Sequence, residues 1–246
     1  MGGAMKHISK SPLFLLVILL LGSRLALADG MAVSKIYHPY VNPIEWELES
    51  RTFLREEDTL TGETDDVLQL IGLGHAVSDR VFAEAYLIAS DDPVSDDIEW
   101  VGLELEALIQ LSEQGEYSVD YGLLVEFERD WALNNNELVV KGLLEREFGR
   151  YSLTLNPGIA YEWGDTRQDE FETKLSSLLR YRYHPYMEPG FEVHLGQTAK
   201  VAGPSIGGQF RLPARGTSVS YDLGAFFPLD EDSPEHTVRL QVEYEF

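Results

Sequence analysis

The last ten residues of the chain, TVRLQVEYEF at 237–246, alternate between apolar and polar positions without interruption. The apolar row is Val238, Leu240, Val242, Tyr244 and Phe246, and the polar row is Arg239, Gln241, Glu243 and Glu245. Successive side chains of a strand point to opposite faces, so this period of two predicts a β-strand with one apolar and one polar side.

The same alternation recurs along the chain, with turn residues between the segments. It predicts twelve strands, at 44–54, 67–76, 81–89, 99–111, 117–129, 137–148, 151–163, 171–183, 190–197, 205–212, 218–227 and 237–246. Most are close to the roughly 9–11 residues that a tilted strand needs to cross a bilayer. An even number of strands is also typical of bacterial single-chain membrane barrels. The fold class predicted is an all-β, antiparallel, up-and-down transmembrane barrel.

Three of these segments distinguish a membrane barrel from a soluble sandwich. In 117–129, 151–163 and 171–183 the apolar row is aliphatic in its middle and aromatic at both ends, where Tyr and Trp favour the membrane interface. Their polar rows carry charges such as Asp120, Glu128 and Arg182. An unpaired ion in a dry sandwich core costs several kcal/mol. The apolar rows are therefore expected to face lipid and the charged rows the lumen.

The first residues have the features of a secretory signal peptide. Lys6 and Lys10 precede an apolar run at 13–21, and Ala26-Leu27-Ala28 supplies small residues for cleavage. The chain contains no cysteine, so disulfides cannot stabilise it. The predicted organisation is a signal peptide at 1–28, a short periplasmic segment at 29–43, and one barrel domain at 44–246.

The signal peptide, the alternating final strand and the terminal Phe246 together resemble the bacterial outer-membrane β-barrel class, including its small porin-like channels. The resemblance implies a Gram-negative outer-membrane location, with contacts to lipid and lipopolysaccharide. It also implies that Tyr244 and Phe246 form the signal for the barrel assembly machinery. The stretch HAVSDRVFAEAYL at 75–87 is weakly similar to transporters of the phenol-degradation-associated outer-membrane family.

The connections predict an orientation for the barrel. Short turns, often with a basic residue, fall at 77–80, 148–150 and 213–216, and longer acidic connections fall between them. Such barrels have short periplasmic turns and longer external loops. Two similar motifs, YHPYVNP at 37–43 and YHPYMEP at 183–189, are then expected at the periplasmic rim, the first before the first strand and the second between the eighth and ninth strands. Proline suits such positions because it has no N–H for the strand ladder.

The inward rows are unevenly charged. The predicted acidic lining residues are Glu45, Glu47, Glu49, Glu84, Glu104, Glu106, Asp120 and Glu126, and the predicted basic ones are Lys174, Arg180, Arg182, Arg211 and Arg239. If the two sets stay apart, they frame a water-filled pore that favours cations. If they meet, their salt bridges plug a structural barrel. Twelve strands lie between the eight that side chains can fill and the sixteen of open porins, so strand number leaves both outcomes open.

The remaining features exclude several functions. The formal net charge of −23 disfavours nucleic acid as a partner. His75, His194 and His236 stand in no sequence typical of a barrel-embedded hydrolase, and His194 is expected to hydrogen-bond in the lumen beside Glu192. We expect no catalytic residues, no cofactor and no metal site. The predicted function is a narrow passive channel for small polar or cationic solutes, with a plugged structural barrel, and then a barrel-embedded hydrolase, as the alternatives.

Overall fold

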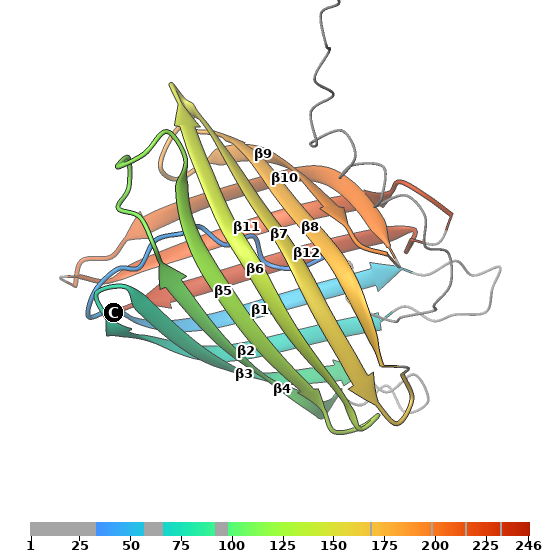
Figure 1. Cartoon of the computed structure of the whole chain (residues 1–246). Helices are drawn as coiled ribbons and strands as arrows, with labels where there is room; N and C mark the ends of the chain where they lie inside the picture. The colour runs from blue at the N-terminus through green and yellow to red at the C-terminus, as the bar shows by residue number, and fades with distance from the viewer. Residues whose placement is uncertain are drawn as a thin grey trace, which may run out of the picture.

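A computed structural model describes residues 33–56, 66–91, 98–167, 169–197, 199–214, 216–231 and 233–246. The described residues form twelve strands in one closed antiparallel barrel, in which each strand pairs with its neighbours in the sequence and β1 pairs with β12 (Figure 1). The strands are β1 (Trp46–Glu56), β2 (Asp66–Ser78), β3 (Val81–Asp91), β4 (Ile98–Gln110), β5 (Asp120–Asp130), β6 (Asn135–Phe148), β7 (Tyr151–Gly164), β8 (Glu170–Tyr181), β9 (Glu188–Leu195), β10 (Lys200–Arg211), β11 (Ser218–Pro228) and β12 (His236–Glu245). The predicted fold class is confirmed.

The barrel closes where its first and last strands meet. Ser50 of β1 lies opposite Val242 of β12 in the antiparallel ladder. At the end of this ladder the backbone N–H of Phe246 donates to the carbonyl of Trp46 at 2.9 Å, and that of Trp46 donates back at 3.0 Å. Closure leaves no unpaired strand edge. We call the end of the barrel with Trp46 and Phe246 the terminal end, and the other end the opposite end.

The two faces of the wall have the predicted inverted polarity. On β7, Thr154 and Glu162 are fully buried, whereas Ile159 is 56% exposed. Exposed leucines and valines lie on the outer face of β6, β8 and β12 in the same way. Aromatic rings gather on the outer face at both ends: Tyr161, Trp163 and Phe171 near the opposite end, and Phe148, Tyr151 and Tyr181 near the terminal end. No helix long and apolar enough to cross a membrane occurs among the described residues.

The chain before β1 lies inside the barrel, where Figure 1 shows it as a blue trace within the ring of strands. We call residues 33–41 the lumen segment. Its Val33 joins an apolar cluster nearer the opposite end, formed with Phe53, Leu70, Tyr86, Ile88, Val201 and Phe226. Its Tyr37 and Val41 join a second cluster nearer the terminal end, formed with Ala76, Phe82, Leu108, Leu124 and Leu143. The lumen segment therefore runs along the lumen between the two ends.

This path corrects two predictions. The described part of the segment expected in the periplasm at 29–43 occupies the lumen instead, because its apolar side chains fill space that the strands leave between them. The first YHPY motif is buried there too, and Tyr37 is only 3% exposed. The second motif does form the turn between β8 and β9, where His184 and Met187 pair across it. The predicted signal peptide and the acidic connections at 57–65 and 92–97 lie outside the described residues.

Two strands begin three or more residues away from their predicted starts, and the others begin within two residues of them. β10 begins at Lys200 rather than 205, because Pro204 lies within the strand, opposite Phe191 of β9. The ladder to β11 is irregular at this point, and a Cβ on Gly203 would lie 1.8 Å from the carbonyl oxygen of Ala225. β5 begins at Asp120 rather than 117, and a nine-residue connection, 111–119, precedes it at the terminal end. The connection 111–119 is therefore an exception to the short turns predicted at the terminal end.

The outer face provides a test of which surface meets lipid. Val140, in the middle of β6, is 42% exposed, whereas its neighbour Lys141 is 6% exposed. We expect Val140→Lys to destabilise the barrel in lipid vesicles by about 2–4 kcal/mol, the usual cost of Lys at the midplane, as measured by urea unfolding. The matched control is Val77→Lys near the end of β2, where the expected cost is about 0–1 kcal/mol. Equal stabilities would contradict a lipid-facing middle row.

Candidate functional site in the lumen

The lumen segment is held by polar side chains that alternate with the outward apolar row. The Tyr37 backbone N–H donates to Asn156 Oδ1 at 2.8 Å, and Asn156 Nδ2 donates to the Tyr37 carbonyl at 3.0 Å. The Tyr37 hydroxyl bonds to Glu106, and the ring of His38 to Glu145. Further along, the Tyr40 hydroxyl donates to Asp120 at 2.8 Å. These partners lie on β4, β5, β6 and β7, so the segment is tied to one side of the wall.

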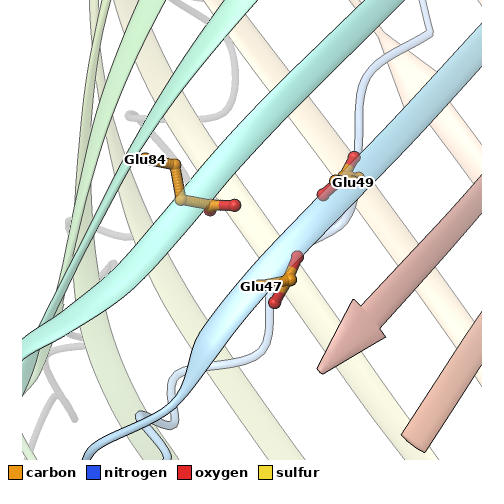
Figure 2. A group of neighbouring side chains, drawn as sticks. All are labelled: Glu47, Glu49 and Glu84. Carbon is orange, nitrogen blue, oxygen red and sulfur yellow. The ribbon is translucent and has the colours of Figure 1, made fainter. Parts of the chain in front are cut away.

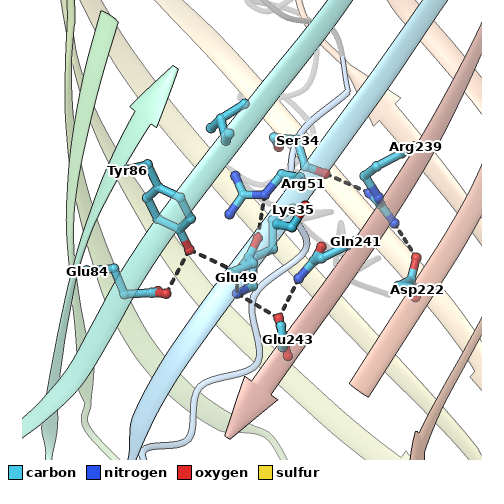
Figure 3. A network of polar contacts seen from close by, with 12 residues as sticks. Ser34, Lys35, Glu49, Arg51, Glu84, Tyr86, Asp222, Arg239, Gln241 and Glu243 are labelled. Atoms are coloured by element: carbon cyan, nitrogen blue, oxygen red, sulfur yellow. Dashed lines mark hydrogen bonds and ion pairs between the residues drawn. The ribbon is translucent and has the colours of Figure 1, made fainter. Parts of the chain in front are cut away.

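Lys35 places a positive charge within the acidic part of the lumen. Its Nζ lies 2.6 Å from Glu49, 2.9 Å from Glu243 and 3.7 Å from Glu47. Figure 2 shows Glu47 and Glu49 on β1 and Glu84 on β3 turned toward one another, and Figure 3 shows Lys35 beside Glu49. An ammonium with three carboxylate neighbours compensates charges that the lumen largely removes from water.

Arg51 compensates the same group from the wall. Its Nε donates to Glu49 at 2.7 Å, and its guanidinium lies 3.8 Å from Glu104 and 3.9 Å from Glu106. The Tyr86 hydroxyl, shown beside them in Figure 3, lies 2.9 Å from Glu49 and 2.7 Å from Glu84. Arg51 is only 2% exposed. The acids of β1, β3 and β4 are therefore engaged in a buried network.

A second charged network lies on the other side of the lumen. Arg239 of β12 donates to Asp222 at 2.6 Å and to the carbonyl of Ser34 at 2.8 Å (Figure 3). It also donates to Glu192 at 2.9 Å. Arg180 of β8 reaches the same Asp222 at 2.7 Å. The network joins β8, β9, β11 and β12 to one backbone group of the lumen segment.

A cavity of about 320 Å³ lies between the lumen segment and this second side. Its lining includes the charged residues Lys35, Arg180, Arg239, Glu188, Glu192, Asp222 and Glu243. It also includes Pro185 and Gln209 near the terminal end, so it extends from that end into the lumen. Acidic and basic groups both line the cavity, which suits small polar solutes.

The predicted lining residues occupy different environments. Glu49, Glu84, Glu104, Glu106, Asp120, Glu126 and Arg239 are buried inward, Glu47, Lys174 and Arg180 are mostly buried, and Arg182 and Arg211 lie at the terminal end, Arg211 exposed. Glu45 precedes β1, and its burial, together with the charge of Glu245, raises the pKa of its carboxyl to about 7. The two charge sets are not kept apart, because basic residues meet acids throughout the lumen.

Three compensating residues were missed in the sequence. Arg51 alternates with Glu47 and Glu49 on the inward row of β1, so the period-two pattern could have found it. Lys141 likewise alternates with Glu145 on β6, and its Nζ lies 2.8 Å from Glu126. Lys35 had no such signal, since its position depends on the path of the lumen segment.

His194 forms a chain of hydrogen bonds that has the residue types of a hydrolase triad. Its Nδ1 lies 3.1 Å from Ser176 Oγ and its Nε2 3.1 Å from Glu192. Neither Ser176 nor His194 lines the lumen cavity, and Glu192 is also bound by Arg239. A nucleophile must reach its substrate, so the three residues act here as a buried link between β8 and β9.

No protein-family model and no curated protein matches the chain. Among solved structures, the chain is similar to the KdgM porin in complex with disordered oligogalacturonate, with 9% identity and a TM-score of 0.53, over 81% of this chain and 98% of that one. It is also similar to the COG4313 outer membrane channel from Pseudomonas putida F1, with 13% identity and a TM-score of 0.59, over 87% and 98% of the two chains. With its closed antiparallel ring of strands, the chain has the fold of the porin-like outer-membrane β-barrels.

Proposed function

We propose that the protein is a passive channel of the bacterial outer membrane for small polar solutes, and that its lumen segment keeps it nearly closed at rest. The observation that carries this proposal is the cavity, which enters the lumen from the terminal end beside a segment that fills the rest. Polar groups lining a narrow pore select its solutes by charge and hydrogen bonding. The similar solved structures are channels, which supports the same function.

The structure changes the expected selectivity. The acids of β1 and β4 are paired with Lys35 and Arg51, and Glu84 of β3 accepts from the Tyr86 hydroxyl, so they cannot act as free cation sites along a pore. The cavity lining combines Lys35, Arg180 and Arg239 with four acidic residues. We therefore propose a weak preference for cations together with passage of neutral polar solutes. The plugged structural barrel stays as the second candidate, because the salt bridges join the segment to both sides of the lumen.

Removal of the lumen segment tests the proposal directly. A chain lacking residues 33–41 is expected to show several-fold larger single-channel conductance in planar bilayers than the wild type, because a twelve-stranded wall alone leaves an open path. Heat-dependent gel mobility verifies that the variant is folded. The milder variant Tyr37→Phe, which removes one hydroxyl contact to Glu106, is expected to open more often at unchanged conductance. No current from either folded variant would favour the structural barrel.

Substitutions of two lumen acids test which side of the lumen conducts. Glu243 lines the cavity, whereas Glu106 does not and instead faces Arg51 and Tyr37. Glu243→Gln is expected to reduce the cation preference, because it removes a negative charge from the cavity lining and one of the three carboxylates beside Lys35. Reversal potentials in a salt gradient measure this change. Glu106→Gln serves as the control with little effect on selectivity. The reverse result would place the conducting path along β4.

We also propose that the outer-membrane lipids surround the barrel and that the assembly machinery recognises its last residues. The rings of Tyr244 and Phe246 stack with centroids 5.3 Å apart, and Phe246 is 48% exposed. Phe246→Ala is expected to lower the amount of barrel in isolated outer membranes, while the same purified variant still refolds in detergent. Phe210→Ala, which removes another exposed ring of the terminal end, is the control. Equal amounts of the Phe246 variant and wild type would contradict recognition through this residue.

A further inference from the structure

Three carboxylates converge inside the barrel at its opposite end. Glu162 is near the end of β7, and Glu170 and Glu172 are in the first residues of β8. Each offers an oxygen, and these oxygens all lie within 4.8 Å of one another. Glu162 and Glu172 alternate with Tyr161 and Phe171, whose rings lie on the outer face. The three side chains therefore share the lumen side of the wall.

Two of these carboxylates are buried without full compensation. Glu162 is 0% exposed and Glu172 is 2% exposed. Arg167 donates to Glu162 Oε2 at 2.9 Å, while Oε1 of the same carboxylate is buried with no hydrogen-bond partner. No hydrogen bond or ion pair to Glu172 occurs within the described ranges. Burial of an ionised carboxylate without a partner costs several kcal/mol, so these carboxyls are stabilised in their ionised form by a bound cation and otherwise by a proton.

Another group of acids in the same lumen receives such a charge from a lysine side chain. Glu47, Glu49 and Glu84 form the other group of three close acids in the described part of the chain. There the Lys35 ammonium binds Glu49 at 2.6 Å and lies 3.7 Å from Glu47 (Figures 2 and 3). At the opposite end, Lys174 ion-pairs with Glu137 rather than with Glu170 or Glu172. The second group therefore brings its acids together as the first does, with Arg167 beside Glu162 but, among the described residues, with no ammonium between the acids.

The surroundings increase the negative charge of this second group. Glu137 is close enough to interact electrostatically with Glu162 and Glu172, and with Glu128. Arg167 and Lys174 are the basic residues that oppose this set. Six carboxylates, those of Glu128, Asp130, Glu137, Glu162, Glu170 and Glu172, thus face two basic side chains at the opposite end of the lumen. This excess attracts cations, and a divalent ion neutralises more of it than a monovalent one.

We propose that Glu162, Glu170 and Glu172 bind a divalent cation, with Ca²⁺ as the best match. Every donor is an oxygen, which is the ligand type that hard cations take. Ca²⁺ accepts oxygens at about 2.3–2.6 Å in irregular geometry, so two of its ligands can lie up to about 5 Å apart, as these do. Mg²⁺ requires a nearly octahedral set at about 2.1 Å, which three carboxylates from one edge of a barrel do not supply. Water molecules complete the Ca²⁺ shell.

The bound ion joins two neighbouring strands across their connection. Glu162 of β7 lies opposite Glu170 of β8 in the ladder, and Glu172 is two positions further along β8. One ion held by all three ties the end of β7 to the start of β8. Binding is therefore expected to raise the thermal stability of the barrel as well as to neutralise Glu172.

The experiment uses the complete mature chain, refolded in detergent and freed of metal with a chelator. Equilibrium dialysis with radioactive Ca²⁺ is expected to show one saturable site per chain with a Kd of about 10⁻⁴–10⁻³ M, the range of extracellular Ca²⁺ modules. Melting followed by circular dichroism is expected to give a higher Tm with Ca²⁺ than without it. Mg²⁺ at the same concentration is expected to bind at least about tenfold more weakly.

Glu172→Gln separates a metal ligand from a structural residue. In this variant the affinity for Ca²⁺ is expected to fall at least about tenfold, while the Tm without Ca²⁺ equals or exceeds that of the wild type because one buried charge is gone. Glu113→Gln, at an exposed acid of the terminal end, is the control and is expected to leave binding unchanged. The proposal is overturned if the wild type shows no saturable site, if Mg²⁺ binds equally well, or if Glu172→Gln binds Ca²⁺ like the wild type. None of these outcomes depends on conductance.

Discussion

The pairing of Lys35 and Arg51 with the acids of β1 and β4 is the interaction on which the rest of the lumen depends. The Nζ of Lys35 and the Nε of Arg51 meet at the carboxylate of Glu49, at 2.6 and 2.7 Å. Within the described residues, removal of Arg51 leaves Glu104 and Glu106 without an ion pair, and removal of Lys35 leaves Glu47 and Glu243 without one. Breaking a buried pair in this way costs about 3–5 kcal/mol. The wall therefore depends on the lumen segment, because the segment carries one of the two cations that compensate the carboxylates of the wall.

The size of the barrel explains why such a segment is needed. The inward residues of eight strands can fill their own lumen, whereas a wall of twelve leaves space along its axis. Val33, Tyr37 and Val41 supply apolar volume to two clusters along this space. A bare charged lumen would hold water, but a segment with alternating apolar and polar contacts can both pack against the wall and pair with its charges.

Most of the barrel wall could be predicted from the sequence, because the position and the two faces of each strand depend on residues that are neighbours in the sequence. The faultless alternation of 237–246 and the aromatic ends of 151–163 each define a strand, its two faces and its lipid side from neighbouring residues alone. The β10 start shows the limit of this reasoning, since Pro204 is tolerated only because the ladder to β11 is already irregular beside Gly203. The position of Lys35 was beyond prediction for a stronger reason. The residues before β1 have no periodicity, and their partners are distant in sequence, as with Tyr37 and Asn156, which are 119 positions apart.

The lumen segment makes more contacts with one side of the barrel than with the other. This difference explains how a lumen with many salt bridges can still contain a conducting path. On one side, hydrogen bonds reach β1, β4, β5, β6 and β7, and they involve both the backbone and the side chain of Tyr37. On the other side, the hydrogen bonds and ion pairs of the described residues join the segment only to β12, through Glu243 and Arg239. Val33 packs with Val201 of β10 and Phe226 of β11, and the cavity lies between the segment and much of β8 to β11. Because the segment is fixed to one side of the wall and bound loosely to the other, solutes can pass along its loosely bound side while the segment stays in the lumen. Salt bridges and conduction are then compatible, since the charges that fix the segment lie mainly on one side and those that line the path on the other.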